Sequence, residues 1–301
     1  MEYIGGVALD YSYFNGLDMY NEGDEVETLV LETFKNHRNP KDVLMHDNRW
    51  PVLYQLSEQR QNIVTPMNIK KSDIVLEIGS GMGALTGALA QRCAQVDCVE
   101  LSQRRSLANA YRNEKYDNIC IYVGNFSDIQ YTKKYDVVTL IGVLEYAQSY
   151  IHDVEEPTAH FLSHIHDLMK PSGKLYIAIE NKLGMKYFAG CKEDHLGEYF
   201  SGIEGYKKSD PARTFTKSEI EKLLINTGFD DLYFYYPYPD YKLPFVIYSD
   251  DMQDGDCIPQ NENYDNSRLK IFDENKAMVH LRNTKEFRIF SNSFLIEAIK
   301  K

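Results

Sequence analysis

Hydrophobic residues in the middle of the chain form short apolar runs that alternate with amphipathic stretches. Apolar runs that predict buried strands lie at residues 74–78, 95–101, 119–123, 135–141 and 174–180. Stretches with helical spacing lie between them, at residues 84–93, 104–113 and 158–169. Strands that alternate with helices predict an α/β fold with a mostly parallel sheet and helices on both faces.

The segments on either side have a different pattern. Residues 24–36 and 50–64 each predict an amphipathic helix, so we expect residues 1–65 to form a helical cap. After the turn predicted at "KPSG", residues 181–214 and 237–270 match no regular element and are interpreted as two insertions. The last predicted elements are helices at 217–227 and 273–282 and strands at 231–236 and 293–299. The predicted domains are a core at 66–236, with a lid insertion at 181–214, and a C-terminal part at 237–301.

Composition narrows the class of protein. The 301 residues are 43% hydrophobic, and their net charge of −12 disfavours nucleic acid as a partner. The five cysteines form neither a CxxC motif nor an even disulfide framework, so we expect reduced thiols. The chain has no basic, apolar N-terminal signal and no apolar run that could span a membrane. These features predict a cytoplasmic protein with no membrane partner; they say nothing about its oligomeric state.

The most informative motif is "VLEIGSGMG", which follows the first strand of the predicted sheet. Gly79, Gly81 and Gly83 allow the backbone to approach a ligand, and ligands of such sheets bind at this edge. A dinucleotide site reads GxGxxG and faces a pyrophosphate, which Glu77 would repel. Glu77 suits an ammonium group instead, and Glu100, at the end of the next strand, suits the two hydroxyls of a ribose. An ammonium group and a ribose without a phosphate describe S-adenosylmethionine (SAM).

Five segments extend this pattern: "VLEIGSGMG", "VDCVELS", "VGNFSDI", "KYDVVTLIGVLEYA" and "LMKPSGKLYIAIEN". In order and spacing they resemble class I SAM-dependent methyltransferases. The resemblance implies a Rossmann-like sheet with an antiparallel last strand, for which "NSFLIEAI" is the candidate, and SAM converted to S-adenosylhomocysteine. It also implies the cofactor-binding residues. Glu77, Gly79, Gly81 and Gly83 hold the methionyl part, Glu100 holds the ribose, Asn125 and Phe126 flank the adenine, and Ile141 and Gly142 lie beside the sulfonium.

Two of these positions need comment. The family more often has Asp where Asn125 stands, although an amide oxygen can still accept a hydrogen bond from the adenine amino group. Tyr54, Ser57 and Arg60 share one stripe of the predicted helix at 50–64. Arg60 is therefore a candidate partner of the methionyl carboxylate, with an ordinary surface arginine as the alternative.

A narrower resemblance lies in "IENKLGMKYFAGCKEDHLGEYFSGIEGY", "RTF" and "YYPYPDYK". These segments are similar to a bacterial branch found in gene clusters for surface glycans and ribosomally made peptides. Some of its members methylate the C-terminal carboxylate of a lanthipeptide-type precursor. The favoured function is O-methylation of such a peptide carboxylate. The alternatives are O-methylation of a sugar hydroxyl and a non-catalytic SAM-binding partner of a biosynthetic complex. An NPPY or DPPY motif, associated with methylation of base amino groups, is absent.

The lid insertion contains the candidate catalytic residues His195, Tyr206 and Arg213. Arg213 would clamp a carboxylate acceptor, with Tyr206 and His195 as further hydrogen-bond donors. A sugar hydroxyl would need a base, for which His195 is the candidate. The alternative is that all three side chains only hold the insertion together.

A metal site is not expected. His160, His164, His166 and Asp167 lie in one predicted helix, but Phe161, Leu162, Ile165, Leu168 and Met169 define its buried face. His160, His164 and Asp167 then point mainly outward. We therefore expect activity to survive a chelator.

Overall fold

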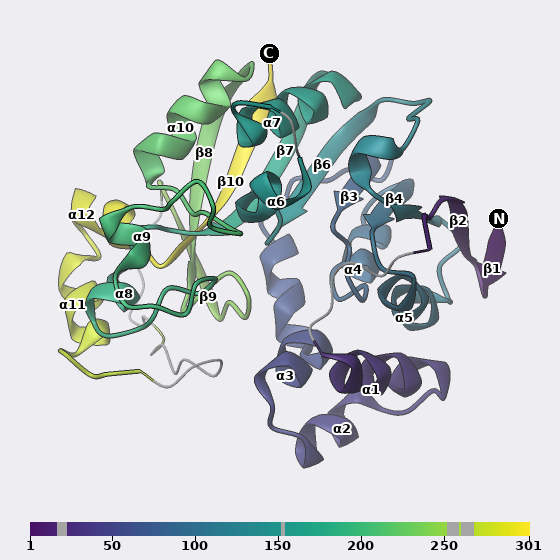
Figure 1. Ribbon diagram of the computed structural model, residues 1–301, viewed down its shortest axis with the longest axis horizontal. Coiled ribbons are helices and arrows are strands. Elements are labelled where there is room, and N and C mark those ends of the chain that lie inside the picture. Colours follow the sequence, from purple (N-terminus) through teal and green to yellow (C-terminus); the bar gives the residue numbers. More distant parts are fainter. Residues whose placement is uncertain (17–22, 152–153, 252–258, 260–267) are drawn as a thin grey trace. The chain divides into compact units, whose positions relative to one another are not determined.

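A computed structural model describes residues 1–16, 23–151, 154–251, 259 and 268–301 (Figure 1). The chain divides into two units. The first unit comprises Met1–Leu140 and Leu168–Gly173, and the second comprises Ile141–Asp167 and Lys174–Lys301. Each unit has its own set of paired strands.

The strands of the first unit form a mostly parallel sheet in the order β1-β2-β5-β4-β3-β6. They are β1 (Glu2–Ile4), β2 (Val7–Tyr13), β3 (Ile74–Ile78), β4 (Gln95–Glu100), β5 (Ile119–Gly124) and β6 (Tyr135–Ile141). All pairs in this unit are parallel except β1 with β2. The four strands predicted here are confirmed as β3 to β6. They could be predicted because strands buried on both faces appear in the sequence as continuous apolar runs.

The N-terminal segment differs from the predicted helical cap. Residues 1–16 contain β1 and β2, and β2 pairs in parallel with β5. Val7 and Leu9 are fully buried, whereas the second half of β2 is partly exposed. The apolar stretch is too short to distinguish a strand from the first turns of a helix by its periodicity.

Helices of the first unit complete its core. They are α1 (Asp24–Lys35), α2 (Pro40–His46), α3 (Trp50–Leu56), α4 (Thr86–Ala90), α5 (Gln103–Asn113) and the 3₁₀ helices η1 (Glu58–Val64) and η2 (Phe126–Asp128). The predicted helix at 50–64 is wrong as one element, because Ser57 is extended and its hydroxyl accepts a hydrogen bond from the Gln59 amide at 3.3 Å. Ser57 therefore ends α3 and caps η1.

The strands of the second unit are antiparallel and have the order β7-β10-β8-β9. Their bounds are β7 (Met169–Glu180, whose first residues belong to the first unit), β8 (Phe229–Tyr238), β9 (Val246–Ser249) and β10 (Ser293–Lys300). Figure 1 shows β10, in yellow, between β7 and β8, which confirms the antiparallel last strand. The "KPSG" segment, predicted as a turn, lies within strand β7, where Ser172 has a φ of 59°. The sequence did not predict β9.

Helices of the second unit are mostly short. They are α6 (Ala147–Tyr150), α7 (Pro157–Leu168), α8 (Met185–Phe188), α9 (Ser201–Glu204), α10 (Lys217–Asn226), α11 (Glu274–Leu281), α12 (Lys285–Phe290) and the 3₁₀ helix η3 (Leu144–Tyr146). A capping box at Thr216 and Glu219 fixes the start of α10. The predicted irregular segment 181–214 contains only α8 and α9, of four residues each. Much of the predicted irregular stretch 237–270 lies outside the described residues.

Two further expectations concern surfaces and thiols. Phe161, Leu162, Ile165 and Leu168 are buried in α7, whereas His160 is exposed, as predicted. Cys93, Cys98 and Cys120 are buried free thiols, and Cys191 is buried as well; Cys257 lies outside the described residues. Within the described part of the chain, no helix combines the length and apolar character needed to cross a membrane.

Candidate functional site

The glycine loop follows β3 in the first unit and bends through three residues with positive φ. Gly79, Gly81 and Gly83 have φ values of 70°, 53° and 74°. A Cβ atom on Gly81 would have no neighbour within 4 Å, so the backbone there faces open space. A Cβ atom on Gly83 would lie 2.2 Å from Oδ1 of Asn109 in α5. Gly81 therefore leaves room for a ligand, whereas Gly83 is required by close packing against α5.

Two carboxylates border this loop. Glu100, at the end of β4, accepts hydrogen bonds from the amides of Gly81 at 2.8 Å and Ser102 at 3.0 Å. A carboxylate has about four acceptor positions, so both oxygens retain capacity for a ribose. Glu77 is only 4% exposed and accepts a hydrogen bond from the Thr86 hydroxyl at 2.6 Å. Burial raises the pKa of Glu77 to about 7, against the opposing effect of that hydrogen bond.

Arg60 follows the break at Ser57, in η1. Its guanidinium lies 3.5 Å from the centre of the Tyr54 ring and donates to the Tyr54 carbonyl at 3.5 Å. The charge of Arg60 also acts to lower the pKa of Glu77, against the larger effect of burial. The predicted partner of the methionyl carboxylate is therefore near the glycine loop rather than isolated on the surface, and its ligand contact stays a prediction.

Asn125 and Phe126 follow β5. The Asn125 side chain accepts a hydrogen bond from the Ser127 amide at 3.0 Å and caps η2. Phe126 is 7% exposed, and its ring centre lies 5.5 Å from that of Tyr131. Both side chains thus have structural roles, and their predicted contacts with adenine stay predictions.

Ile141 and Gly142 begin the second unit. Gly142 has a φ of 71°, and its amide donates to the Ala178 carbonyl in β7 at 3.0 Å. A Cβ atom on Gly142 would lie 2.9 Å from the Tyr241 hydroxyl and 3.6 Å from Oε1 of Glu145. Only glycine fits here without displacing Tyr241, so polar side chains closely surround the residue that the family resemblance puts beside the sulfonium.

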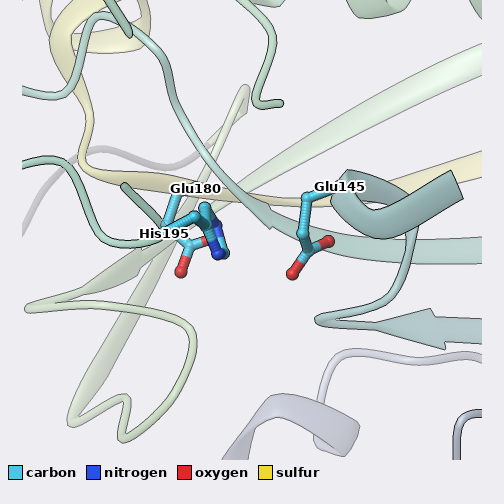
Figure 2. A group of neighbouring side chains, drawn as sticks. All are labelled: Glu145, Glu180 and His195. Carbon is cyan, nitrogen blue, oxygen red and sulfur yellow. The ribbon is translucent and has the colours of Figure 1, made fainter. Parts of the chain in front are cut away.

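Two buried carboxylates and a part-buried histidine gather in the second unit to form what we call the acid–histidine cluster: Glu145, Glu180 and His195 (Figure 2). Glu145 lies in η3, Glu180 is the last residue of β7, and His195 comes from the segment after α8. One oxygen or nitrogen of each lies within 4.8 Å of the others. Glu145 is 1% exposed and Glu180 is fully buried.

His195 is held from both ring nitrogens. Its Nδ1 lies 3.1 Å from the Tyr146 hydroxyl, and its Nε2 lies 3.4 Å from Oε2 of Glu180. The Tyr146 and His195 rings also meet edge to face, with centres 5.3 Å apart. The imidazole orientation is therefore fixed by two different elements, η3 and β7.

A chain of ion pairs extends outward from Glu180 of the cluster. Lys242 binds Oε1 of Glu180 at 2.6 Å and Asp194 at 2.8 Å, and Lys186 binds Asp194 at 2.8 Å and Asp240 at 2.9 Å. By contrast, Oε2 of Glu145 is buried and has no hydrogen-bond partner among the described residues. Glu145 is thus the member of the cluster with an oxygen still to be satisfied.

The charges of the cluster follow from these contacts. Burial and the nearby Glu180 raise the pKa of Glu145 to about 8. Burial opposes ionisation of Glu180, but Lys242 and His195 outweigh it and hold the pKa of Glu180 well below its usual range. Burial likewise opposes protonation of His195, yet Glu180 raises the pKa of His195 to about 9.

The three predicted catalytic residues have different surroundings. His195 belongs to the acid–histidine cluster, and the Arg213 amide donates to the Glu145 carbonyl at 2.9 Å. The Arg213 guanidinium lies over Phe215, 5.0 Å from the ring centre, with its buried Nε unpartnered within the described structure. Tyr206 instead shares hydrogen bonds with Glu193 at 2.9 Å and Thr214 at 2.7 Å. The Tyr206 hydroxyl is therefore engaged in holding the lid together.

Sequence reasoning missed Glu145, Glu180, Tyr241 and Lys242. A signal was present for the two acids, because Glu180 ends one predicted strand and Glu145 lies four residues beyond another. Carboxyl ends of sheet strands are where such folds bind ligands. No comparable signal marks Tyr241, which lies beside Gly142, or Lys242, which binds Glu180; both come from a segment predicted as irregular.

With this geometry established, the chain can be compared with known proteins. Residues 76–175 match a family described as a methyltransferase domain. The chain carries a methyltransferase domain. This domain includes the glycine loop, Glu100, Gly142 and Glu145, and it ends within β7.

Curated relatives match the methyltransferase domain over parts of their length. The chain is 32% identical over 82 residues to "Ribosomal RNA small subunit methyltransferase A" of Syntrophus aciditrophicus, covering 27% of each protein. It is 28% identical over 162 residues to "Ubiquinone biosynthesis O-methyltransferase" of Idiomarina loihiensis, covering 50% of this chain and 63% of that protein. The chain therefore spans less than two thirds of the length of these relatives.

Solved structures match more of the chain at lower identity. A chain from the complex with the Haloferax volcanii Trm112 methyltransferase activator has a TM-score of 0.50 and 17% identity, covering 93% of this chain and 99% of that one. Phosphoethanolamine N-methyltransferase 1 of Haemonchus contortus has a TM-score of 0.50 and 14% identity, covering 92% and 49%. These similarities confirm the predicted Rossmann-like fold. They do not reveal the peptide or glycan branch.

Proposed function

We propose that the chain is a SAM-dependent O-methyltransferase whose acceptor is a hydroxyl group. The methyltransferase domain supports methyl transfer in general. The cofactor assignment is supported by the glycine loop, where Gly81 faces open space and Glu77 and Glu100 supply the two carboxylates. Glu77 would attract the ammonium group of SAM, and Glu100 would accept the ribose hydroxyls.

The observation that carries the choice of acceptor is the burial of two carboxylates near Gly142. Glu145 lies 3.6 Å from the Cβ position of Gly142, and Glu180 lies in the same cluster. When Glu145 is ionised, above its pKa of about 8, two buried carboxylates repel an anionic acceptor at close range. They favour an acceptor that donates a hydrogen bond, and Oε2 of Glu145 is free among the described residues to receive one.

The reaction balances with these groups. The acceptor oxygen attacks the methyl carbon in line with the departing sulfur, so an O–C bond forms as the C–S bond breaks. The electron pair stays on sulfur, which leaves as a neutral thioether. The hydroxyl proton passes to a carboxylate oxygen of the acid–histidine cluster, for which Glu145 in its ionised form, above its pKa of about 8, is the candidate.

The second candidate is the peptide C-terminal carboxylate. It is favoured by Arg213, whose buried Nε has no hydrogen-bond partner in the described structure, and by the positive charge of His195. Tyr206 supports this candidate less, because Glu193 and Thr214 already engage its hydroxyl. The relative named for ubiquinone biosynthesis O-methylates its substrate, which supports an oxygen acceptor without choosing between hydroxyl and carboxylate.

The experiment is a transfer assay with SAM that carries a tritiated methyl group. The acceptors are a panel of sugars and other hydroxylated compounds and a panel of peptides with free C-terminal carboxylates. The labelled products are then treated with mild base, which releases methanol from a methyl ester and leaves a methyl ether intact. Base-stable label is expected. Base-labile label on peptides alone would contradict the hydroxyl proposal, and SAM binding without any transfer would support a non-catalytic SAM-binding protein.

A further inference from the structure

We propose that the acid–histidine cluster binds a divalent transition-metal ion, with Glu145, Glu180 and His195 as ligands. This is the opposite of the expectation from the sequence, which considered only the histidines of α7. The structure instead groups the ligand atoms of Glu145, Glu180 and His195 within the second unit (Figure 2). Ion binding itself is independent of the proposed function, whereas the role given to the ion below rests on it.

The contact between His195 and Glu180 has the length expected across an ion. Nε2 of His195 and Oε2 of Glu180 are 3.4 Å apart, longer than the usual 2.7–2.9 Å of a charged hydrogen bond. Two ligands that each lie about 2.1 Å from one ion are roughly 3.0–3.4 Å apart at angles of about 90–110°. The pair is therefore already spaced as adjacent ligands.

Glu145 supplies the second observation. Its side chain is 1% exposed, and Oε2 has no hydrogen-bond partner among the described residues. Figure 2 shows its carboxylate beside Glu180 and His195, and one ligand atom of each residue lies within 4.8 Å of the others. A buried, unsatisfied carboxylate oxygen is costly unless it meets a cation or a donor, and a small side-chain rotation would complete the ligand set.

Neighbouring groups orient these ligands from behind. The Tyr146 hydroxyl lies 3.1 Å from Nδ1 of His195, which leaves Nε2 to face the cluster. Lys242 binds the other oxygen of Glu180 at 2.6 Å, and the Arg213 amide binds the Glu145 carbonyl at 2.9 Å. Ligands of bound metals are commonly held by such outer hydrogen bonds.

The donor set selects the kind of ion. Two carboxylates and one imidazole, with no thiolate, suit Mn²⁺, Fe²⁺ or Zn²⁺ and leave coordination positions open for water or substrate. Lys242 already neutralises part of the charge on Glu180, so an ion and the Lys242 ammonium share that residue's two oxygens. In the alternative arrangement, Nε2 of His195 and Oε2 of Glu180 share a proton in a hydrogen bond, and the cluster then binds no ion.

An ion here would act on the acceptor. It would hold the acceptor oxygen near Gly142 and lower the pKa of the bound hydroxyl by its charge. The second oxygen of Glu145 would remain available to take the proton as the methyl group is transferred.

The test is a titration of the 301-residue chain with Mn²⁺, with free Mn²⁺ measured by electron paramagnetic resonance. We expect one site per chain and at least tenfold weaker binding in Glu145→Gln and His195→Ala. His160→Ala, which changes an exposed histidine of α7, is the matched control and should bind Mn²⁺ like the wild type. Pulsed measurements on the wild-type complex should detect coupling to one imidazole nitrogen, a readout that needs no variant to fold.

Calorimetric SAM binding on the same samples separates the two proposals. SAM binding with no binding of Mn²⁺ or Zn²⁺ at millimolar concentration would overturn the metal site and leave the proposed function standing. Metal binding without SAM binding would do the reverse. Metal binding that is equal in the wild type and both cluster variants, or that lacks the nitrogen coupling, would also overturn this assignment.

Discussion

The glycine loop of the first unit and the acid–histidine cluster of the second unit are built in opposite ways. The loop is local: Gly79, Gly81 and Gly83 lie within five residues, and its main partner Glu100 ends the adjacent strand. The cluster is assembled from residues 35 and 50 positions apart, since it joins Glu145 to Glu180 and to His195. A local site can be recognised as a motif, whereas a distributed one needs the fold.

The two regions also differ in how their polar groups are satisfied. Both oxygens of Glu100 accept backbone hydrogen bonds, so the loop is already ordered for its ligand. The cluster keeps one oxygen of Glu145 without a partner among the described residues. A preformed binding loop and an unsatisfied polar cluster are the features expected of a cofactor site and a reaction site, respectively.

Glu145→Gln should have the largest effect that distinguishes the two regions, because it should change the transfer rate but not SAM binding. This change removes a proton acceptor and a ligand from the cluster, so transfer to a hydroxyl acceptor should fall about 10²–10⁴-fold in single-turnover rates. SAM affinity, measured by calorimetry, should change less than twofold. Tyr206→Phe is the control, because its hydroxyl only links Glu193 to Thr214 and its loss should leave the rate within a few fold.

The same assay ranks the two acceptors. With a hydroxyl acceptor, Glu145→Gln and His195→Ala should reduce the rate more than Arg213→Ala. A larger loss in Arg213→Ala than in Glu145→Gln would instead favour a carboxylate acceptor. The ion pair between Arg213 and the acceptor carboxylate would then matter more for the rate than proton removal by Glu145.

A smaller effect is expected for Glu100→Ala on the loop side. The ribose hydroxyls would lose two charge-assisted hydrogen bonds, each worth about 1.5–3 kcal/mol, so SAM affinity should weaken at least tenfold. The amides of Gly81 and Ser102 would also lose their acceptor, and Glu100→Gln controls for this by keeping one acceptor oxygen. Unchanged SAM affinity in a folded Glu100→Ala chain would disprove the ribose assignment.

The extent of successful prediction follows the same division between local and distributed features. Strands β3 to β6 and β10 were predicted almost residue for residue, because buried strands appear as continuous apolar runs. Strands β1 and β2 were missed because Val7–Tyr13 is short, and α3 was overextended because the capping role of Ser57 is invisible to hydrophobic periodicity.

For the candidate site, the sequence proposed His195 and Arg213, whose catalytic roles stay predictions, but not the residues beside them. The ring of His195 contacts Glu180, which lies 15 residues earlier at the end of β7, and Tyr146 in η3. Such contacts depend on how the segment after α8 folds back, which no spacing rule specifies. Tyr206 was chosen for its chemistry, yet its neighbours Glu193 and Thr214 occupy its hydroxyl.

The glycines of the loop can be separated by stability. Ala at Gly83 would put a Cβ atom 2.2 Å from Oδ1 of Asn109 at a positive φ, so we expect a loss of about 2–3 kcal/mol in the free energy of unfolding. Gly81→Ala meets no such contact and should cost about 1 kcal/mol, from its positive φ alone. Urea unfolding of the two variants measures the difference. Equal losses would mean that Gly83 is not constrained by α5.

The smallest predicted effect concerns the charge of Glu77. Burial raises its pKa to about 7, above the 4.5 of an unperturbed Glu, so the folded chain holds this proton over a range in which the unfolded chain has lost it. The neutral form is the one that burial favours, whereas the ionised form is the one that attracts the ammonium group of SAM. SAM affinity and the stability of the unliganded chain should therefore change with pH in opposite directions.

Between about pH 7.5 and about pH 6 the ionised fraction of Glu77 falls from roughly three quarters to roughly one tenth, so SAM affinity should fall by just under tenfold. Over the same change the unliganded chain should gain about 1 kcal/mol of stability from this group, because the folded state binds more protons than the unfolded state between pH 4.5 and 7. Calorimetry of SAM binding and urea unfolding measure the two quantities. Glu77→Gln is the matched control: the difference between it and the wild type should reproduce both trends. If the wild type and Glu77→Gln show the same pH dependence of SAM affinity, Glu77 does not bind the ammonium group and has a structural role, as the acceptor for Thr86 and Cys98.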